Sequence, residues 1–259
     1  MKLLLASVLL GTVALAQSNI PDLAKLKLAA EAGNAAAQHE YASRIALSNA
    51  KESFEFNLKS ANQGFGPAED VVGQHYLSMA PYDAKDGGKL ERLGVRYTSR
   101  AAFKVIPNAQ ANLSECYERG TALPKNPALS YAWMALALRT AGGPGSMSAL
   151  VYKMRLDQLV ARIPSSAIIE GQKLAESIRA GSPEMNPVEA DLIVAQMRIT
   201  GFFFGDGRKA VMVNQVRFSK GETKALPIDG DAVALLCTAI EGKSAKFKMS
   251  AYEFTLLSK

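Results

Sequence analysis

Residues 118–143 read ERGTALPKNPALSYAWMALALRTAGG, and this stretch carries the pattern that decides the fold. Trp133 is followed four positions later by an alanine, and an aromatic residue next to a small one on the same helical face allows close helix packing. The same order, with a small residue four positions after the aromatic one, occurs upstream at Phe56 (Ser60) and Tyr97 (Ala101). The aromatic residues are 41 (97 − 56) and 36 (133 − 97) positions apart, near the period of paired-helix repeats. The pattern predicts a stack of helical hairpins over residues 29–142.

We expect a first helix before each helix that carries one of these aromatic residues. Each first helix is marked by an alanine and then by larger residues four and eight positions later. These sets are Ala37, Tyr41 and Ile45, then Ala68, Val72 and Tyr76, then Ala109, Leu113 and Tyr117. Spacing by four places each set on one helical face, which we expect to be buried. The aromatic residues expected to act as structural anchors of the repeats, rather than as ligand contacts, are Phe56, Tyr76, Tyr97, Tyr117 and Trp133.

The fragments AAEAGNAAAQ (29–38) and SANQGFGPAE (60–69), together with residues 118–143, resemble Sel1-like repeats, which are related to tetratricopeptide repeats. The resemblance covers about residues 24–145, and Val105 departs from it where a turn glycine belongs. Residues 163–178, IPSSAIIEGQKLAESI, are similar to the helix that closes such arrays. The resemblance implies an α-solenoid whose activity is the binding of protein or peptide partners rather than catalysis.

The composition changes after the repeats. Residues 181–195 begin with a segment rich in glycine, serine and proline, which predicts a linker. Residues 196–259 contain short β-branched and aromatic runs between turn signals, which predicts five or six strands in a small antiparallel β-barrel. The turn residues around Gly201, Asn214 and Gly221 resemble the periplasmic domain of the type II secretion C component and the pilus lipoprotein P, which implies an envelope adaptor.

Lysines alternate with apolar residues near the C-terminus. A strand here would bury Phe247 and Met249 and would present Lys246 and Lys248, with Lys243 nearby, as a basic docking surface. The alternative is that lysines on an outer strand only prevent edge-to-edge aggregation. The sequence leaves both interpretations open.

Residues 1–16 combine Lys2, an apolar run and the small residues Ala14 and Ala16, which is typical of a cleaved signal peptide. An uncleaved anchor is the competing interpretation, but the run is shorter than the roughly 20 apolar residues that span a bilayer. We therefore expect a periplasmic or secreted mature chain without a transmembrane segment.

The chain has 30 Lys and Arg against 24 Asp and Glu, a net charge of +6. Removal of Lys2 would leave +5, and residues 196–259 contribute +4 (ten cations minus six anions). An excess of this size in an exported chain does not indicate a nucleic-acid surface, and protein partners or anionic envelope polymers are the expected counterparts. Cys116 and Cys237 could pair, or could be two separately buried thiols.

Residues that could support catalysis are sparse. His39 and His75 are the only histidines, and neither has further ligands at metal-binding spacing, so no metal site is predicted. Ser48 and Lys51 match the Ser-x-x-Lys element of penicillin-recognising enzymes, but the accompanying elements are absent. We predict no catalytic residue and no cofactor.

The sequence thus predicts an α+β multidomain protein: an α-solenoid of helical hairpins followed by a small antiparallel β-barrel. The predicted divisions are a signal peptide (1–16), a helical repeat domain (17–180), a linker (181–195) and a β-barrel domain (196–259). The predicted function is a non-enzymatic exported adaptor that binds protein partners in a helical groove, with the β domain as a second docking module. The alternatives are a cell-wall enzyme or ligand-binding protein, and a structural subunit of an envelope secretion or pilus assembly.

Overall fold

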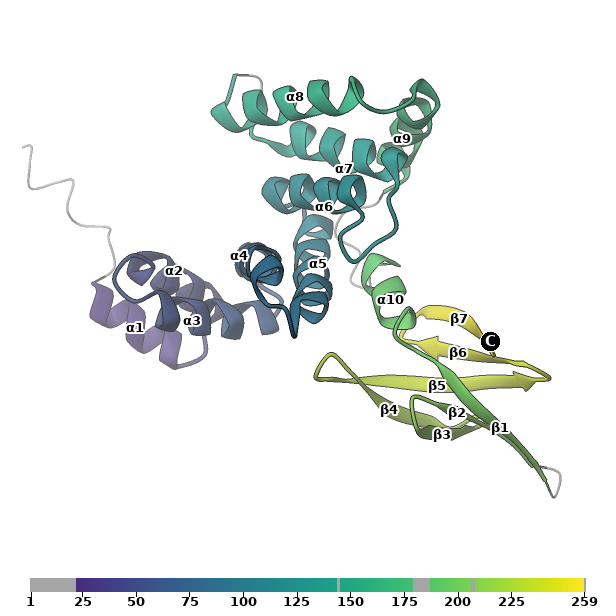
Figure 1. Cartoon of the computed structure of the whole chain (residues 1–259). Coiled ribbons are helices and arrows are strands. Elements are labelled where there is room, and N and C mark those ends of the chain that lie inside the picture. Colours follow the sequence, from purple (N-terminus) through teal and green to yellow (C-terminus); the bar gives the residue numbers. More distant parts are fainter. Residues whose placement is uncertain (1–21, 144, 179–186, 206–207, 259) are drawn as a thin grey trace, which may run out of the picture. The chain divides into compact units, whose positions relative to one another are not determined.

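The computed structural model describes residues 22–143, 145–178, 187–205 and 208–258 (Figure 1). The predicted signal peptide lies outside the described residues. The chain divides into two compact units, and the division falls between Ala68 and Glu69.

Helices make up the chain from Leu23 to Val194. They are α1 (Leu23–Glu31), α2 (Ala35–Ile45), α3 (Ala50–Asn62), α4 (Gly66–Met79), the short 3-10 helix η1 (Ala80–Tyr82), α5 (Gly87–Phe103), α6 (Pro107–Arg119), α7 (Pro127–Thr140), α8 (Met147–Val160), α9 (Ser165–Ser177) and α10 (Pro187–Val194). The predicted hairpins correspond to the consecutive pairs α2 and α3, α4 and α5, and α6 and α7. The closing helix predicted within residues 163–178 is α9.

The first unit packs α1, α2 and α3 around a small apolar core. Asn34 and Asn49 begin α2 and α3, because each side chain accepts a hydrogen bond from a main-chain N–H three residues later. Tyr41 and Phe56 meet edge to face, with ring centroids 5.0 Å apart. Both side chains are buried, together with Ile45. The predicted apolar faces of α2 and α3 therefore form this core.

A left-handed residue follows the second helix of every hairpin and also follows α1. The φ angles are +94° at Gly33, +82° at Gly64, +63° at Val105 and +85° at Gly142. Val105, which departs from the repeat pattern in sequence, thus adopts the backbone conformation that glycine supplies in the other turns. A β-branched residue in this region is strained.

Small residues bring the helices of the second unit close together. A Cβ atom on Gly73 of α4 would lie 2.5 Å from Thr98 Oγ1 of α5, and one on Gly171 of α9 would lie 2.6 Å from the Ala128 carbonyl oxygen of α7. Trp133 on α7 is only 1% exposed and meets Phe103 edge to face at 5.1 Å. Close approach at these glycines thus brings α4 against α5 and α9 against α7.

The C-terminal region forms two antiparallel sheets. The strands are β1 (Ile199–Gly205), β2 (Arg208–Val213), β3 (Val216–Ser219), β4 (Thr223–Ile228), β5 (Asp231–Glu241), β6 (Ser244–Met249) and β7 (Tyr252–Leu257). One sheet has the order β1-β2-β3 and the other has the order β4-β5-β6-β7. Strand β3 is absent from the sequence prediction because Asn214 and Gln215, at φ +43° and +71°, form its tight turn without a glycine.

The two sheets share one core, but in the described residues they do not close into a barrel. Phe218 of β3 and Phe247 of β6 meet edge to face at 5.3 Å, and both are fully buried. No strand pairing joins the three-stranded sheet to the four-stranded one among the described strands. The antiparallel β region is therefore confirmed, whereas the closed barrel is not.

Residues 187–194 of the predicted linker form α10, so this part of the linker prediction was wrong. Pro187 begins the helix, as proline can at a first helical position. Val188 and Leu192 belong to the same apolar core as Trp133, whereas Ala190 and Ile193 belong to the core of the sheets. A helix of this length with apolar residues on two faces is stabilised by burial from both sides. Residues 179–186 of the same segment lie outside the described residues.

Within the described ranges, none of the helices has both the length and the apolar character needed to cross a membrane.

Candidate functional site

Two neighbouring hollows lie over the helices of the later hairpins and α8. The larger has a volume of about 480 Å³ and lies over α4, α5 and α6. Its lining residues are Gln74, Leu77, Ser78, Pro81, Glu91, Asn108, Asn112, Glu115, Cys116, Arg119 and Thr121. The smaller has about 270 Å³ and is lined by Glu115, Glu118, Arg119, Met134, Arg155, Gln158, Leu159 and Arg162, which belong to α6, α7 and α8. Glu115 and Arg119 line both hollows, so we call the combined depression the groove.

One face of α6 supplies the polar side of the groove. Asn108, Asn112 and Arg119 follow at helical spacing, opposite the face that buries Ala109 and Leu113. Asn108 donates a hydrogen bond to Asp70 of α4 at 2.8 Å. The side-chain nitrogen of Asn112 is buried and has no hydrogen-bond partner among the described residues. An amide group in this state favours a rearrangement that gives it an acceptor.

Two of the ion pairs in the groove expose their cations more than their anions. Arg119 is 2.6 Å from Glu115, with side-chain exposures of 71% and 34%, and Arg162 is 2.8 Å from Glu118, with 60% and 33%. Arg155 of α8 also contacts Glu115, at 3.0 Å. Each guanidinium carries five N–H donors and uses only part of them on its carboxylate. The α8 end of the groove therefore presents cationic hydrogen-bond donors to solvent.

Cys116 lines the groove but is not suited to nucleophilic chemistry. Burial, with a smaller contribution from the charge of Glu115, raises the pKa of its thiol to about 12. The reactive form of cysteine is the thiolate, which is scarce at neutral pH when the pKa is this high. Both Cys116 and Cys237 are free and buried, in agreement with the second of the two interpretations from the sequence.

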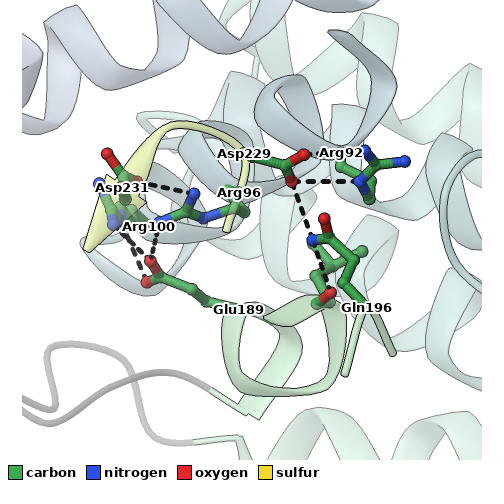
Figure 2. Close-up of polar contacts among 8 residues, drawn as sticks. Arg92, Arg96, Arg100, Glu189, Gln196, Asp229 and Asp231 are labelled. Carbon is green, nitrogen blue, oxygen red and sulfur yellow. Dashed lines mark hydrogen bonds and ion pairs between the residues drawn. The ribbon is translucent and has the colours of Figure 1, made fainter. Parts of the chain in front are cut away.

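A second polar cluster joins α5 to α10 and to the turn between β4 and β5 (Figure 2). Arg92 binds Asp229 with two hydrogen bonds, at 3.1 and 2.8 Å, and Gln196 donates to the same carboxylate at 2.8 Å. Arg96 and Arg100, one and two turns further along α5, both bind Glu189 of α10. We call this cluster the junction.

The junction is buried at its centre. The side chains of Arg96 and Glu189 are 5% and 7% exposed and lie 3.2 Å apart. Arg96 Nη1 also lies 2.8 Å from Asp231, without hydrogen-bond geometry, and its Nε has no hydrogen-bond partner among the described residues. Buried charges of this kind hold their positions because separating them would leave an uncompensated charge.

The pKa values of the junction carboxylates reflect this pairing. Burial alone would raise the pKa of Glu189, but the hydrogen bond and the charge of Arg100, together with Arg96, outweigh it and hold this pKa below its ordinary value. Burial would also raise the pKa of Asp229, but the hydrogen bonds from Arg92 and Gln196 outweigh burial and hold this pKa below its ordinary value. Both carboxylates are therefore ionised at neutral pH.

Glu69 of α4 shows the opposite balance. Its side chain is buried, and Lys104 contacts it at 2.6 Å from the end of α5. Burial raises the pKa of Glu69, and the hydrogen bond and charge of Lys104 only partly oppose this. A single, more exposed lysine thus compensates a buried carboxylate less well than two arginines do.

The aromatic residues predicted as anchors fall into two groups. Phe56, Tyr117 and Trp133 are buried in apolar cores. Tyr76 and Tyr97 are half-buried and stack on each other, with ring centroids 6.0 Å apart. The guanidinium of Arg100 lies 5.5 Å from the Tyr97 ring, so this anchor also borders the junction.

The predicted basic docking surface does not form the edge that the sequence suggested. Lys246 and Lys248 lie on β6, which β5 and β7 flank on both sides. Lys246 is 3.6 Å from Glu241 and Lys248 is 3.9 Å from Glu253. Phe247 and Met249 are buried as predicted. Lys243 is exposed in the turn before β6, and the neighbouring carboxylates offset much of the charge of the other two lysines.

The residues that the sequence offered for chemistry make ordinary local contacts. Ser48 donates a hydrogen bond to the Ile45 carbonyl oxygen at 3.1 Å, and it is exposed together with Lys51. His39 lies 2.8 Å from the Asn57 side-chain oxygen. Among the residues described, no three His, Cys, Asp or Glu side chains gather in a way that could hold a metal ion.

The functional arrangement differs from the sequence prediction because it depends on partners far apart in the chain. Arg92, Arg96 and Arg100 recur every four residues, and Asn108 and Asn112 do so as well, so both polar stripes are readable. The carboxylates that face the arginines lie 89 or more positions away. Spacing alone does not identify such partners.

Comparison with known proteins supports the fold of the helical part. No family model matches the chain, and no curated protein matches its sequence. A protective antigen of uropathogenic Escherichia coli strains, which displays an SLR (Sel1-like repeat) fold, aligns with a TM-score of 0.51 and 17% identity. The alignment covers 71% of this chain and 37% of the antigen, so this chain spans well under half of that protein.

A Sel1 repeat protein from Oxalobacter formigenes aligns with 25% identity over 54% of this chain and 99% of that protein, at a TM-score of 0.43. The likeness to the antigen shows a Sel1-like helical-repeat fold. The resemblance of the strands to the type II secretion C component and the pilus lipoprotein P stays a prediction.

Proposed function

We propose that this chain is an exported, non-enzymatic scaffold that binds an extended segment of a partner protein in the groove. The observation that carries the proposal is that the two hollows are neighbours and share Glu115 and Arg119 in their linings. Together their linings extend from α4 across α6 to α8, over a longer and more open surface than the enclosed pockets in which small molecules are usually bound. Helical repeats create such surfaces because each hairpin adds one strip of side chains.

The chemistry of the groove fits a polypeptide main chain. Gln74, Asn108, Asn112 and Gln158 offer amide groups that can donate and accept. An extended chain presents carbonyl oxygens and N–H groups at regular intervals. The buried Asn112 nitrogen would gain an acceptor if the partner's carbonyl displaced its neighbours.

The exposed arginines select for negative charge at one end. Arg119 and Arg162 extend beyond their carboxylate partners, so an acidic residue of the partner can bind them without first breaking a buried pair. Arg119 lines both hollows, whereas Glu91 lines only the hollow over α4, and Arg155 and Arg162 line only the one beside α8. We therefore infer that the acidic part of the partner lies against α8.

Export belongs to the same proposal and rests on the signal-like sequence of residues 1–16. The mature protein would be periplasmic or secreted, where its partners are other envelope proteins. Mass spectrometry of the protein recovered from the periplasm tests this step, and a mature chain that begins at Gln17 is the expected result. Retention of Lys2 in the recovered chain would contradict it.

A photo-crosslinking residue placed at three glutamines tests the groove. Gln74 and Gln158 line it, whereas Gln172 is an exposed glutamine on α9 outside it. We expect the first two positions to crosslink to the same polypeptide in the living envelope and the third to give no such product. Equal crosslinking from Gln172 would contradict the proposal, and a carbohydrate adduct would favour a cell-wall ligand instead.

The crosslinked segment, made as a synthetic peptide, allows the contacts to be measured. Replacing Arg119 by alanine should weaken binding roughly tenfold, which corresponds to about 1.4 kcal/mol. The matched control is Arg139→Ala, which changes an exposed arginine on α7 that lines neither hollow. The two variants should differ in affinity but not in helical circular dichroism.

A further inference from the structure

Strand β1 lies at an edge of the three-stranded sheet, and its outer side is not paired with another described strand. Its sequence, ITGFFFG, contains no charged residue and no proline. Natural edge strands usually carry such residues, because an unprotected edge pairs with strands of other chains. A register shift between Ile199 and Gly201 interrupts only its beginning. Residues 202–205 therefore form an unprotected edge.

The register shows which main-chain groups face outward. Val213 and Val216 close a two-residue turn, so the N–H and C=O of Val213 point to β3. Alternate residues of β2 then point to β1, and Ala210, the partner of Phe203, is one of them. The flanking residues Phe202 and Phe204 consequently direct their N–H and C=O groups to the free edge. This is the arrangement that an added strand requires.

Aromatic side chains flank the edge on both faces of the sheet. Phe204 is 59% exposed and stacks on Phe202, with centroids 6.0 Å apart and nearly parallel rings. Phe203 points to the opposite face, is 45% exposed and lies 5.4 Å from the Arg217 guanidinium. The hairpin of β1 and β2 projects beyond the rest of the sheets (Figure 1). An added strand would thus find an apolar contact for side chains on either face.

The charged residues on the strands of this sheet are of one sign. Lys209 pairs in register with Phe204, and Arg217 lies on the face of Phe203. Both are exposed, and the charge of Arg217 acts on Glu222 in the turn after β3. Strands β1, β2 and β3 contain no Asp or Glu. A second copy of this chain would bring the same cations together, whereas an acidic segment would neutralise them.

We propose that β1 binds an extended, acidic segment of a partner protein by strand addition. The segment forms main-chain hydrogen bonds with Phe202 and Phe204, places its apolar side chains on the exposed phenylalanines, and directs carboxylates to Lys209 and Arg217. This site is independent of the groove, because it uses other residues and another part of the second unit. It gives the chain a second docking surface, for a partner that is recognised by its main chain and its charge.

A synthetic peptide of alternating valine and glutamate is the probe for this site, and its analogue with lysine in place of glutamate is the control. Fluorescence anisotropy with the full mature chain should show binding of the acidic peptide, with the lysine peptide at least roughly tenfold weaker. Amide exchange should slow at Phe202 and Phe204 when the acidic peptide is present. Equal binding of both peptides would overturn the proposal.

Two variants separate the main chain from the side chain. Phe204→Pro removes the outward N–H and leaves the pairing with β2 intact, whereas Phe204→Ala keeps the N–H and removes only the ring. We expect Phe204→Pro to weaken binding at least roughly tenfold more than Phe204→Ala does. Unchanged circular dichroism and amide exchange in β2 and β3 show that both variants are folded.

The remaining outcomes are also decisive. If Arg119→Ala in the groove abolishes binding of the acidic peptide and Phe204→Pro does not, the peptide binds in the groove and the proposal is wrong. If the chain without peptide forms dimers that Phe204→Pro dissociates, the edge binds a second copy and not an acidic partner. Binding that is lost in Phe204→Pro and kept in Arg119→Ala supports the proposal and leaves the function of the groove to its own test.

Discussion

Arginine–carboxylate pairs occur in two regions of the second unit, with opposite exposure. At the junction, Arg96 and Glu189 are both buried, and α5, α10 and the β4–β5 turn meet around them. In the groove, Arg119 and Arg162 extend into solvent from half-buried carboxylates. Removing one partner of a buried pair typically costs 3–5 kcal/mol, whereas an exposed pair contributes about 0–1 kcal/mol. The same chemistry thus fixes the architecture in one place and remains available to a partner in the other.

The strongest test of this comparison deletes one carboxylate from each region. Glu189→Ala should lower the free energy of unfolding by about 3–5 kcal/mol, because it removes the buried partner of Arg96 and leaves only the exposed Asp231 beside this guanidinium. Glu118→Ala, which removes the partner of Arg162 in the groove, should lower it by less than about 1 kcal/mol. Urea denaturation followed by circular dichroism measures both. Similar losses in the two variants would show that burial does not separate the regions.

The second test concerns the apolar residues beside the junction. Leu192 of α10 packs into the core that contains Trp133, and Ile193 packs into the core of the sheets. Leu192→Ala and Ile193→Ala should each cost about 2–4 kcal/mol through loss of buried surface and cavity formation. Because α10 belongs to both cores, we expect the helical core and the sheets to unfold together.

The fluorescence of Trp133, the single tryptophan, reports on the helical core, and far-ultraviolet circular dichroism reports on the whole chain. In both variants the unfolding transition measured by Trp133 fluorescence should move to a lower urea concentration. The transition measured by circular dichroism, which includes the sheets, should move with it. If Ile193→Ala unfolds the sheets while Trp133 stays buried, the helical core and the sheets fold independently, and α10 only connects them.

The sequence allowed the repeats to be predicted because their contacts are local. Tyr41, Phe56 and Trp133 are separated from their small or apolar neighbours by whole helical turns, so spacing alone identifies the buried faces. Even the departure at Val105 marks a turn of the expected kind. The three predicted hairpins and the closing helix follow from this periodicity.

The β region and the junction could be predicted only in part because their contacts are distant. Asp229 lies in the turn between β4 and β5, but its pairing with Arg92 joins residues 137 positions apart. The segment of α10 follows a stretch rich in glycine, serine and proline, which favours a linker, and only the two cores around it make a helix the better solution. Strand β3 was missed because its turn lacks glycine. Tertiary contacts decide each of these cases.

Acid distinguishes the junction from the rest of the unit. The pKa values of Glu189 and Asp229 are lowered in the folded state. Their contribution to stability is therefore fully present when the pH is above the pKa of these groups in the unfolded chain, which is near 4. It is lost as the pH falls through the folded values. We expect the free energy of unfolding to decrease below about pH 4, and less so in Glu189→Gln, which has already lost one of the two contributions.

Glu69 acts in the opposite direction, because its pKa is raised in the folded state. Its ionisation weakens the fold as the pH rises through this region, so its protonation partly offsets the acid loss at the junction. Glu69→Gln should therefore lose more stability between pH 5 and pH 3 than the unmodified chain does. Equal pH slopes in Glu69→Gln and Glu189→Gln would contradict the assigned directions.

The smallest effect is expected at the end of the helix that carries the junction arginines. Helix α5 ends before Val105, at φ +63°, whereas α7, at the groove, ends before Gly142, at φ +85°. The left-handed conformation costs a residue with a Cβ about 1–2 kcal/mol, and glycine avoids this cost but loses more entropy on folding. Val105→Gly should therefore stabilise the protein by about 0.5–1 kcal/mol.

The reverse substitution is the matched control. A Cβ at Gly142 would meet no atom within 4 Å, so Gly142→Val changes only the backbone energy and should destabilise by about 1–2 kcal/mol. Val105 is 40% exposed, so the loss of its partly covered side chain costs less than the loss of a fully buried valine would. Urea midpoints that move in opposite directions for the two variants would confirm that both turns share one conformation. A destabilised Val105→Gly would mean that the valine side chain contributes more at the end of α5 than the strained backbone costs.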